Sequence, residues 1–190
     1  MSAADSARVY YTSARTELIE RIKLRDGVLV LYLAAVGALF GIAVGGGVEK
    51  QKLLLLLPFL AFGAAVIISQ HTSVIGALAS YCVTELAPFL RGLAPSEDAP
   101  QWDDSRALAQ YQHAAVHLRT WGHGVMIIIP AVIALSFNWD NVSFSALNAF
   151  VIMWVAGVLM LVLAGFVIWR AHVTRTTLFS DTPWRSPPDT

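Results

Sequence analysis

The sequence is poor in charge. Only 14% of its 190 residues are Asp, Glu, Lys or Arg, whereas 56% are hydrophobic. A soluble domain carries about 25% charged residues, so this composition indicates a membrane protein. The 13 basic and 13 acidic residues cancel, and a chain without net charge has no overall basic field to attract nucleic acid. We therefore expect the lipid bilayer, and not nucleic acid, as a partner.

Cysteine is almost absent as well. Cys82 is the only one in the chain, which excludes an intrachain disulfide and a zinc site built from several thiolates. The sequence also lacks a phosphate-binding glycine loop, an HExxH zinc motif and a GxSxG nucleophile motif. We predict no cofactor and no metal, and we expect a protein without enzymatic activity.

Four uncharged apolar segments are present, each of roughly the length that crosses a bilayer at 1.5 Å per residue. Because backbone polar groups in lipid must bond within the chain, each segment is predicted to be helical. The predicted spans are 28–47, 53–69, 121–138 and 147–169. The absence of ionisable Asp, Glu, Lys and Arg from all four argues against an ion-coupled transporter.

Basic residues are distributed very unequally about these spans. Four crossings place both termini and residues 70–120 on one side, which then carries eleven of the 13 basic residues; Lys50 and Lys52 lie on the other. The positive-inside rule makes the richer side cytoplasmic. We expect a protein of the cytoplasmic (inner) membrane of a bacterial cell. The first 27 residues are too long and too mixed in charge for a secretory n-region, so the first span is predicted to be a retained anchor.

Amphipathic segments extend the spans. Apolar residues recur at helical spacing over 5–26, which predicts one continuous cytoplasmic and membrane helix at the start of the chain. Beyond the second span, residues 74–90 are predicted to continue as a cytoplasmic stalk; the alternative is an interfacial or re-entrant segment. Residues 88–104, with three prolines and a glycine, are predicted to form a loop. The proline-rich tail, 180–190, is predicted to be disordered.

Two apolar seams predict a cytoplasmic helical hairpin over residues 70–120, with the seam of the second helix packed against that of the third. The seam residues are Ile75, Leu78, Cys82, Leu86 and Phe89 on one helix, and Leu108, Tyr111, Ala115, Leu118 and Gly122 on the other. The predicted fold is therefore an all-α integral membrane four-helix antiparallel bundle, a single domain over 1–190, whose first three helices extend into the cytoplasm. The hairpin is a candidate surface for a cytoplasmic protein partner.

A stripe of glycines marks one face of the first span. Gly37, Gly41 and Gly45 are four residues apart and leave a face with almost no side chain, which another membrane helix can approach closely. One interpretation is packing against another helix of the same chain. The other is the interface of a homo-oligomer.

Three polar residues of the third helix form a candidate site. His113 and His117 are four residues apart and are able to hold a metal from one helical face; the alternative is a solvated polar stripe. Arg106 and His113 have six residues between them, a spacing that resembles the arginine–histidine motif of the HEPN ribonuclease family. The resemblance covers these two positions, with Ala107 after the arginine. It implies that Arg106 and His113 act in a helical dimer cleft.

These features favour a non-enzymatic, homo-oligomeric membrane sensor, effector or scaffold that couples a cytoplasmic signal to the bilayer. The alternative is a gated channel or a membrane-disrupting pore, because a hydrophobically gated pore among several subunits needs no charged lining. A third hypothesis is a membrane-anchored HEPN-like ribonuclease or another enzyme.

Overall fold

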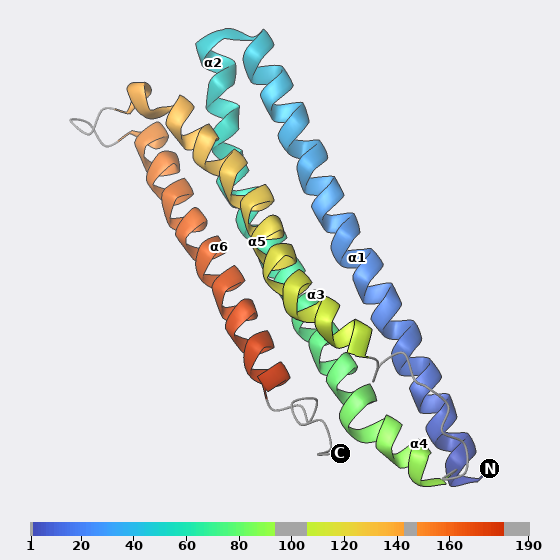
Figure 1. Ribbon diagram of the computed structural model, residues 1–190. Helices are drawn as coiled ribbons and strands as arrows, with labels where there is room; N and C mark the ends of the chain where they lie inside the picture. Colours follow the sequence, from blue (N-terminus) through green and yellow to red (C-terminus); the bar gives the residue numbers. More distant parts are fainter. Residues whose placement is uncertain (1, 94–105, 143–147, 181–190) are drawn as a thin grey trace.

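The computed structural model describes residues 2–93, 106–142 and 148–180; the side chains of residues 48, 106–117, 119–120 and 175–180 lie outside this description. The described chain is helical throughout and contains no strand, which confirms the all-α prediction. Its elements are α1 (Ala3–Gly45), α2 (Gly47–Gln51), the 3-10 helix η1 (Lys52–Leu56), α3 (Leu57–Tyr81), the π-helical turn η2 (Cys82–Leu86), α4 (Ala87–Leu93), α5 (Arg106–Phe137), the 3-10 turn η4 (Trp139–Asn141) and α6 (Ala149–Ser180). The long helices lie lengthwise beside one another (Figure 1).

Helix α1 is a single helix of 43 residues, as predicted. A capping box starts it, in which the Ser2 hydroxyl accepts from the Asp5 amide and the Asp5 carboxylate accepts from the Ser2 amide. The helix ends at Gly45, and Gly47 has a φ of 71°, a conformation that glycine adopts without steric cost. At 1.5 Å per residue α1 is about 65 Å long.

The second long helical segment also runs without a break, through η1, α3, η2 and α4. Pro58 lies in the first turn of α3, where the absence of its N–H is tolerated. The predicted loop at 88–104 is wrong at its start, because α4 continues to Leu93. Pro88 is the second residue after the π-helical turn, where the regular i→i−4 ladder is already interrupted, so a proline costs less there than in mid-helix. Residues 94–105 lie outside the described residues.

Helix α3 is the centre of the bundle and packs most extensively against α6 and α1. In the most apolar part of Glu49–Leu93 half of the residues are buried, against 11% in α1 and 17% in α6. The main core combines small and large residues from all four long helices: Tyr32, Ala61, Ala64, Ala65, Ile68, Ile127, Ala131 and Ala164. Small side chains on α3 let its neighbours approach closely, which is how membrane helices gain packing energy.

Three helical segments are long and apolar enough to cross a membrane: Ala3–Gly45, Glu49–Leu93 and Ala149–Thr174. The apolar part of α5, Trp121–Phe137, is shorter. The lengths and composition therefore support a membrane protein, with three full-length spans where the sequence predicted four.

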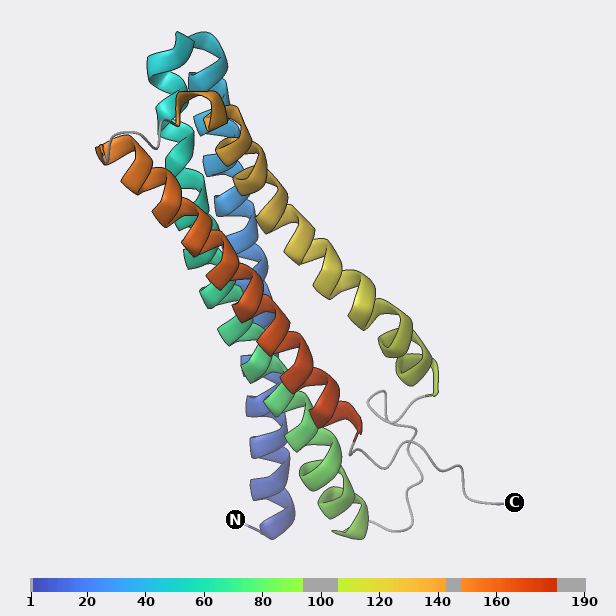
Figure 2. The same cartoon turned by 90° about the vertical axis from the view of Figure 1, so that its left-hand side faces the viewer.

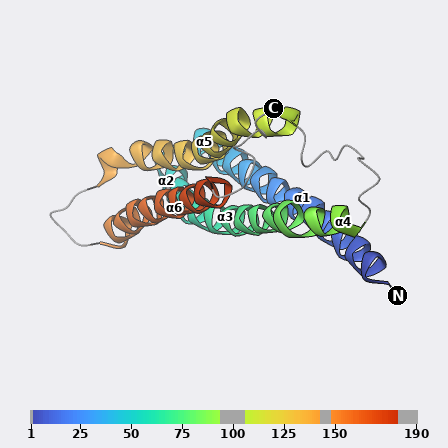
Figure 3. The same ribbon diagram turned by 60° about the horizontal axis from the view of Figure 1, so that its bottom comes forward.

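The predicted packing of the η2 and α4 segment against α5 stays a prediction, because the side chains of Leu108, Tyr111 and Ala115 lie outside the described part of the structure. Both η2 and α4 contact α1, and Cys82, Leu86 and Ala7 are among the buried residues of these elements. Leu118, predicted for the opposing seam on α5, is 77% exposed. Figures 2 and 3 show the N-terminal part of α5 diverging from α3 and α4. The described part of this segment therefore packs beside α1.

Candidate functional site

The predicted glycine face of α1 is exposed. Among the described residues, no heavy atom outside the local helix lies within 4 Å of the position that a Cβ would take at Gly37, Gly41 or Gly45. Helix α1 instead packs through its opposite side, where Tyr32 and Ala43 are 5% and 2% exposed. The structure therefore contradicts the interpretation that the glycine face packs within the chain, and the oligomer interpretation stays a prediction.

The close approach of helices that glycine permits occurs at Gly157 on α6. A Cβ there would lie 3.2 Å from Leu135 Cδ2 and 3.3 Å from Pro58 Cγ. Both neighbours are buried, so α6 is held against α3 and α5 at this point. Gly157 lies on α6 and does not belong to the glycine stripe on α1.

Arg106, His113 and His117 all lie on α5, and Arg106 is its first residue. Their side chains are outside the described part of the structure, so the metal and ribonuclease hypotheses stay predictions. Among the side chains that are described, no group of three or more His, Cys, Asp and Glu residues is placed to hold a metal ion.

The structure assembles a different polar site, a cavity of about 30 Å³ between the four long helices. Each helix contributes polar groups: Arg25 from α1, Ser69 and Thr72 from α3, His123 from α5 and His172 from α6. Ile68, Gly124, Ile127, Ile168 and Ala171 complete its lining. The cavity therefore has one polar part and one apolar part.

Arg25 is the dominant charge of this site. The residue is only 5% exposed, although a cation is rarely buried unless it is paired. Its Nε and Nη2 atoms both donate to Oδ1 of the neighbouring Asp26, at 2.9 and 2.8 Å. The Asp26 side chain is 54% exposed, so the pair joins a buried cation to a carboxylate that faces outward. Thr72 uses its hydroxyl locally, donating to the Ile68 carbonyl at 2.8 Å.

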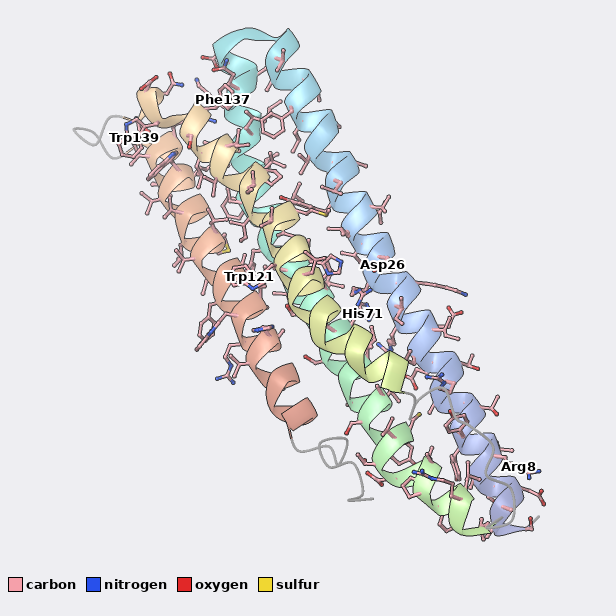
Figure 4. The ribbon with its side chains drawn as sticks, in the orientation of Figure 1. Arg8, Asp26, His71, Trp121, Phe137 and Trp139 are labelled. Carbon is pink, nitrogen blue, oxygen red and sulfur yellow. The ribbon has the colours of Figure 1, made fainter. Side chains whose placement is uncertain are left out.

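The cavity lies at one end of the apolar segments. Arg25 precedes the first predicted span, Ser69 ends the second, His123 follows the start of the third and His172 follows the end of the fourth. In Figure 4, Asp26, His71 and Trp121 lie at a similar level along the bundle, whereas Phe137 and Trp139 lie toward the end that carries α2. Two tryptophans thus bracket α5, as aromatic residues do at the two surfaces of a membrane.

Sequence reasoning missed this site because it used Arg25 and His172 only to orient the chain. A usable signal existed in α1. Arg25 is seven residues before Tyr32, and residues seven apart lie on the same side of a helix. A charged residue on the core-facing side of α1, buried in line with Tyr32, is the feature that marks the cavity.

At the other end of the apolar layer, Trp139 and Trp154 form an edge-to-face pair with ring centroids 5.3 Å apart. The Trp154 indole Nε1 donates to the Leu135 carbonyl at 3.1 Å, an acceptor that the sequence did not identify. Both rings border an open hollow of about 350 Å³. Few polar groups line this hollow, so it is better suited to contact with lipid than to a catalytic role.

Comparison with known proteins adds no further constraint. No protein-family model matches this chain, and no curated protein sequence or solved structure matches it.

Proposed function

We propose that the chain is a multi-pass protein of the cytoplasmic membrane that forms an antiparallel four-helix bundle with both termini in the cytoplasm. In this proposal it is a non-enzymatic, homo-oligomeric sensor, effector or scaffold. It receives a signal at its cytoplasmic helices and passes it to the bilayer.

The observation that carries the proposal is the exposed small-residue face of α1. Ala34, Gly37, Ala38, Gly41 and Gly45 are all exposed, on the side opposite the buried Tyr32 and Ala43. In lipid, a smooth face of this kind gains dispersion contacts when another helix packs closely on it. Since α1 turns its other side to its own chain, a second copy of α1 is the partner that this face fits.

Continuous helices support the coupling of cytoplasm to membrane. Helix α1 is about 65 Å long, whereas the hydrocarbon core is about 30 Å thick. Roughly half of α1 therefore extends beyond the apolar layer, where it contacts η2 and α4. A displacement imposed on this stalk by a cytoplasmic partner is transmitted along the same helix to the proposed subunit interface.

The test is Gly41→Leu, measured as the mass of the full chain in detergent and as its thermal melting temperature. We expect the wild type to be an oligomer and the variant to have the mass of one chain. The melting temperature of the monomeric unit should be retained, because a Cβ at Gly41 meets nothing within 4 Å. Gly165→Leu on α6, where the Cβ position is also open, is the matched control and should leave the oligomer intact.

A wild-type chain that is monomeric in several detergents and in nanodiscs would exclude self-association. An oligomer mass that Gly41→Leu leaves unchanged would exclude the glycine face of α1 as the interface. Ion flux separates the proposal from a channel or pore. Liposomes that contain the purified protein should retain an ion gradient, whereas dissipation of the gradient by the protein would favour the pore.

A further inference from the structure

We propose that the four-helix cavity binds the phosphate group of an anionic phospholipid from the cytoplasmic leaflet. This inference rests on the membrane placement in the proposed function. It assigns a ligand to a site whose polar groups come from four different helices, so that the ligand connects all four at one level.

The donor chemistry of the cavity suits phosphate. The Arg25 guanidinium has five N–H donors in a planar fork that matches the oxygens of phosphate. Two of its nitrogens are engaged by Asp26 Oδ1, which leaves further N–H donors for a ligand. The Ser69 hydroxyl and the imidazoles of His123 and His172 line the same space, and each is able to donate to an anion.

The electrostatics of Arg25 also favour an added anion. A buried cation is costly unless several hydrogen bonds compensate for its lost hydration. In the described structure the compensation comes from Asp26, whose carboxylate is about half exposed at 54%. A phosphate group in the cavity would supply a second negative charge from the buried side, while Asp26 remains toward water.

The remaining lining explains why the ligand is a lipid. Ile68, Ile127 and Ile168 border the cavity beside the polar groups, so an amphiphile finds apolar contact for its first methylene groups. The cavity lies where the apolar segments end, which is the level of lipid phosphates. Basic pockets between membrane helices on the cytoplasmic side are known sites for anionic headgroups.

The size and charge of the site define its selectivity. A volume of about 30 Å³ is close to that of one water molecule in the liquid, so the cavity admits a phosphate oxygen that faces Arg25 and leaves the rest of the headgroup outside. A choline headgroup would bring its own cation close to Arg25 and the two imidazoles, which costs Coulomb energy. We therefore expect phosphatidylglycerol to bind in preference to phosphatidylcholine.

The experiment is native mass spectrometry of the full chain with added phosphatidylglycerol or phosphatidylcholine, with inorganic phosphate as competitor. The wild type should retain one phosphatidylglycerol per chain at about a tenfold lower lipid concentration than phosphatidylcholine. Arg25→Gln should lose this preference. Arg21→Gln is the matched control, because Arg21 lies one turn earlier on α1, is 33% exposed in its side chain and pairs with Glu17.

A second variant tests the cavity without changing its charge. A Cβ at Gly124 would lie 3.7 Å from Ile168 Cγ2, an ordinary contact, so Gly124→Val is compatible with the fold while its methyl groups fill the cavity. It should abolish selective phosphatidylglycerol binding. Gly122→Val on the same helix, where the Cβ position is open, should not.

The proposal is overturned if the wild type shows no preference between the two lipids, or if Arg25→Gln and Gly124→Val retain it. Displacement of the lipid by an equal concentration of inorganic phosphate would assign the site to a soluble phosphate compound and overturn the lipid assignment. The same spectra report the oligomer mass. Lipid binding that fails in an intact oligomer contradicts this inference alone, and a monomer that keeps its lipid contradicts only the proposed self-association.

Discussion

Two buried polar side chains of this bundle, Tyr32 and Asn138, each donate to a backbone carbonyl of a neighbouring helical segment. The Tyr32 hydroxyl donates to the Ile127 carbonyl at 2.8 Å. Asn138, which is 0% exposed, donates to the carbonyls of Ala134 at 2.9 Å and Gln51 at 3.2 Å. Each such bond fixes the rotation and axial position of one helix against the next, which apolar contacts alone specify less strictly.

The Tyr32 bond lies beside the proline of α5. Pro130 has no N–H for the carbonyl of Met126, and the sequence predicts a weakened ladder there. The structure places a hydroxyl on the next carbonyl, that of Ile127. The sequence shows where the proline lies, but it does not show which side chain donates to the neighbouring carbonyl. Choosing among the tyrosines requires the register of α1 against α5.

Tyr32→Phe is therefore expected to destabilise the folded bundle by about 1 kcal/mol, since it leaves a buried carbonyl without this donor and removes no apolar contact. The measurement is unfolding of the full chain in mixed micelles with increasing denaturing detergent. Tyr10→Phe is the control, because Tyr10 is 63% exposed. Equal unfolding midpoints for Tyr32→Phe and the parent would show that the hydrogen bond contributes nothing.

At the scale of elements, the amino-acid pattern predicted helices better than it predicted their faces. Continuous helicity from the stalk into the first span followed from spacing and from the absence of proline. The pattern did not predict which side of α1 faces the core, because the residues on both sides are apolar or small. Tyr32 and Ala43 lie on one side, and Gly37 and Gly41 lie on the other. Because neither side of this part of α1 is polar, the spacing of its apolar residues does not indicate which side faces the core.

The same ambiguity hid the glycine at which helices approach closely within the chain. Gly157 is the position at which an added methyl group meets rigid neighbours, the Pro58 ring at 3.3 Å and Leu135 at 3.2 Å. Only the crossing of α3, α5 and α6 makes it different from other glycines in α6, and a crossing point depends on three helices together.

Gly157→Ala is accordingly expected to destabilise the fold by about 1 kcal/mol, because the clash with Pro58 and Leu135 outweighs the gain in helix propensity. Gly165→Ala on the same helix has open space at its Cβ and should be neutral or slightly stabilising. The measurement is the thermal melting temperature of both variants in one detergent. A melting temperature for Gly157→Ala equal to that of Gly165→Ala would contradict the close contact.

For the whole molecule, the number and order of helices were predictable, and their pairing was less so. Apolar length located the spans, since lipid imposes one requirement on each segment separately. The partner of α4 depends instead on contacts between distant parts of the chain. Among the described residues α4 contacts α1, and the two seams predicted for the hairpin are similar in composition, so sequence spacing had no means to distinguish α1 from α5 as the partner.

The polar cavity also depends on contacts between distant parts of the chain. Each of Arg25, Ser69, His123 and His172 is unremarkable alone, near the end of an apolar segment. Their convergence requires that all four helices end their apolar parts at one level. In the proposed topology that level is the lipid boundary, so membrane placement as much as packing brings the four groups together.

The proposed function and the phosphate site both depend on the membrane topology, and that topology depends on whether α5 crosses the membrane. Its apolar part, Trp121–Phe137, spans about 25 Å at 1.5 Å per residue, less than the hydrocarbon core of about 30 Å. Hydrogen bonds nevertheless tie it to its neighbours near its middle, through the Ile127 carbonyl, and just after its last residue, through Asn138. We expect α5 to cross, with local thinning of the bilayer accommodating its length.

Single cysteines in a Cys82→Ser background test this, because Cys82 is 1% exposed and its replacement removes the only native thiol. With a membrane-impermeant maleimide on intact cells, Lys50→Cys and Asp140→Cys should be labelled. Arg8→Cys and Thr174→Cys should react only after permeabilisation. If α5 does not cross, Asp140→Cys is protected and Thr174→Cys is labelled from outside; the four polar groups then cannot share one surface of the membrane, and the phosphate site fails with the topology.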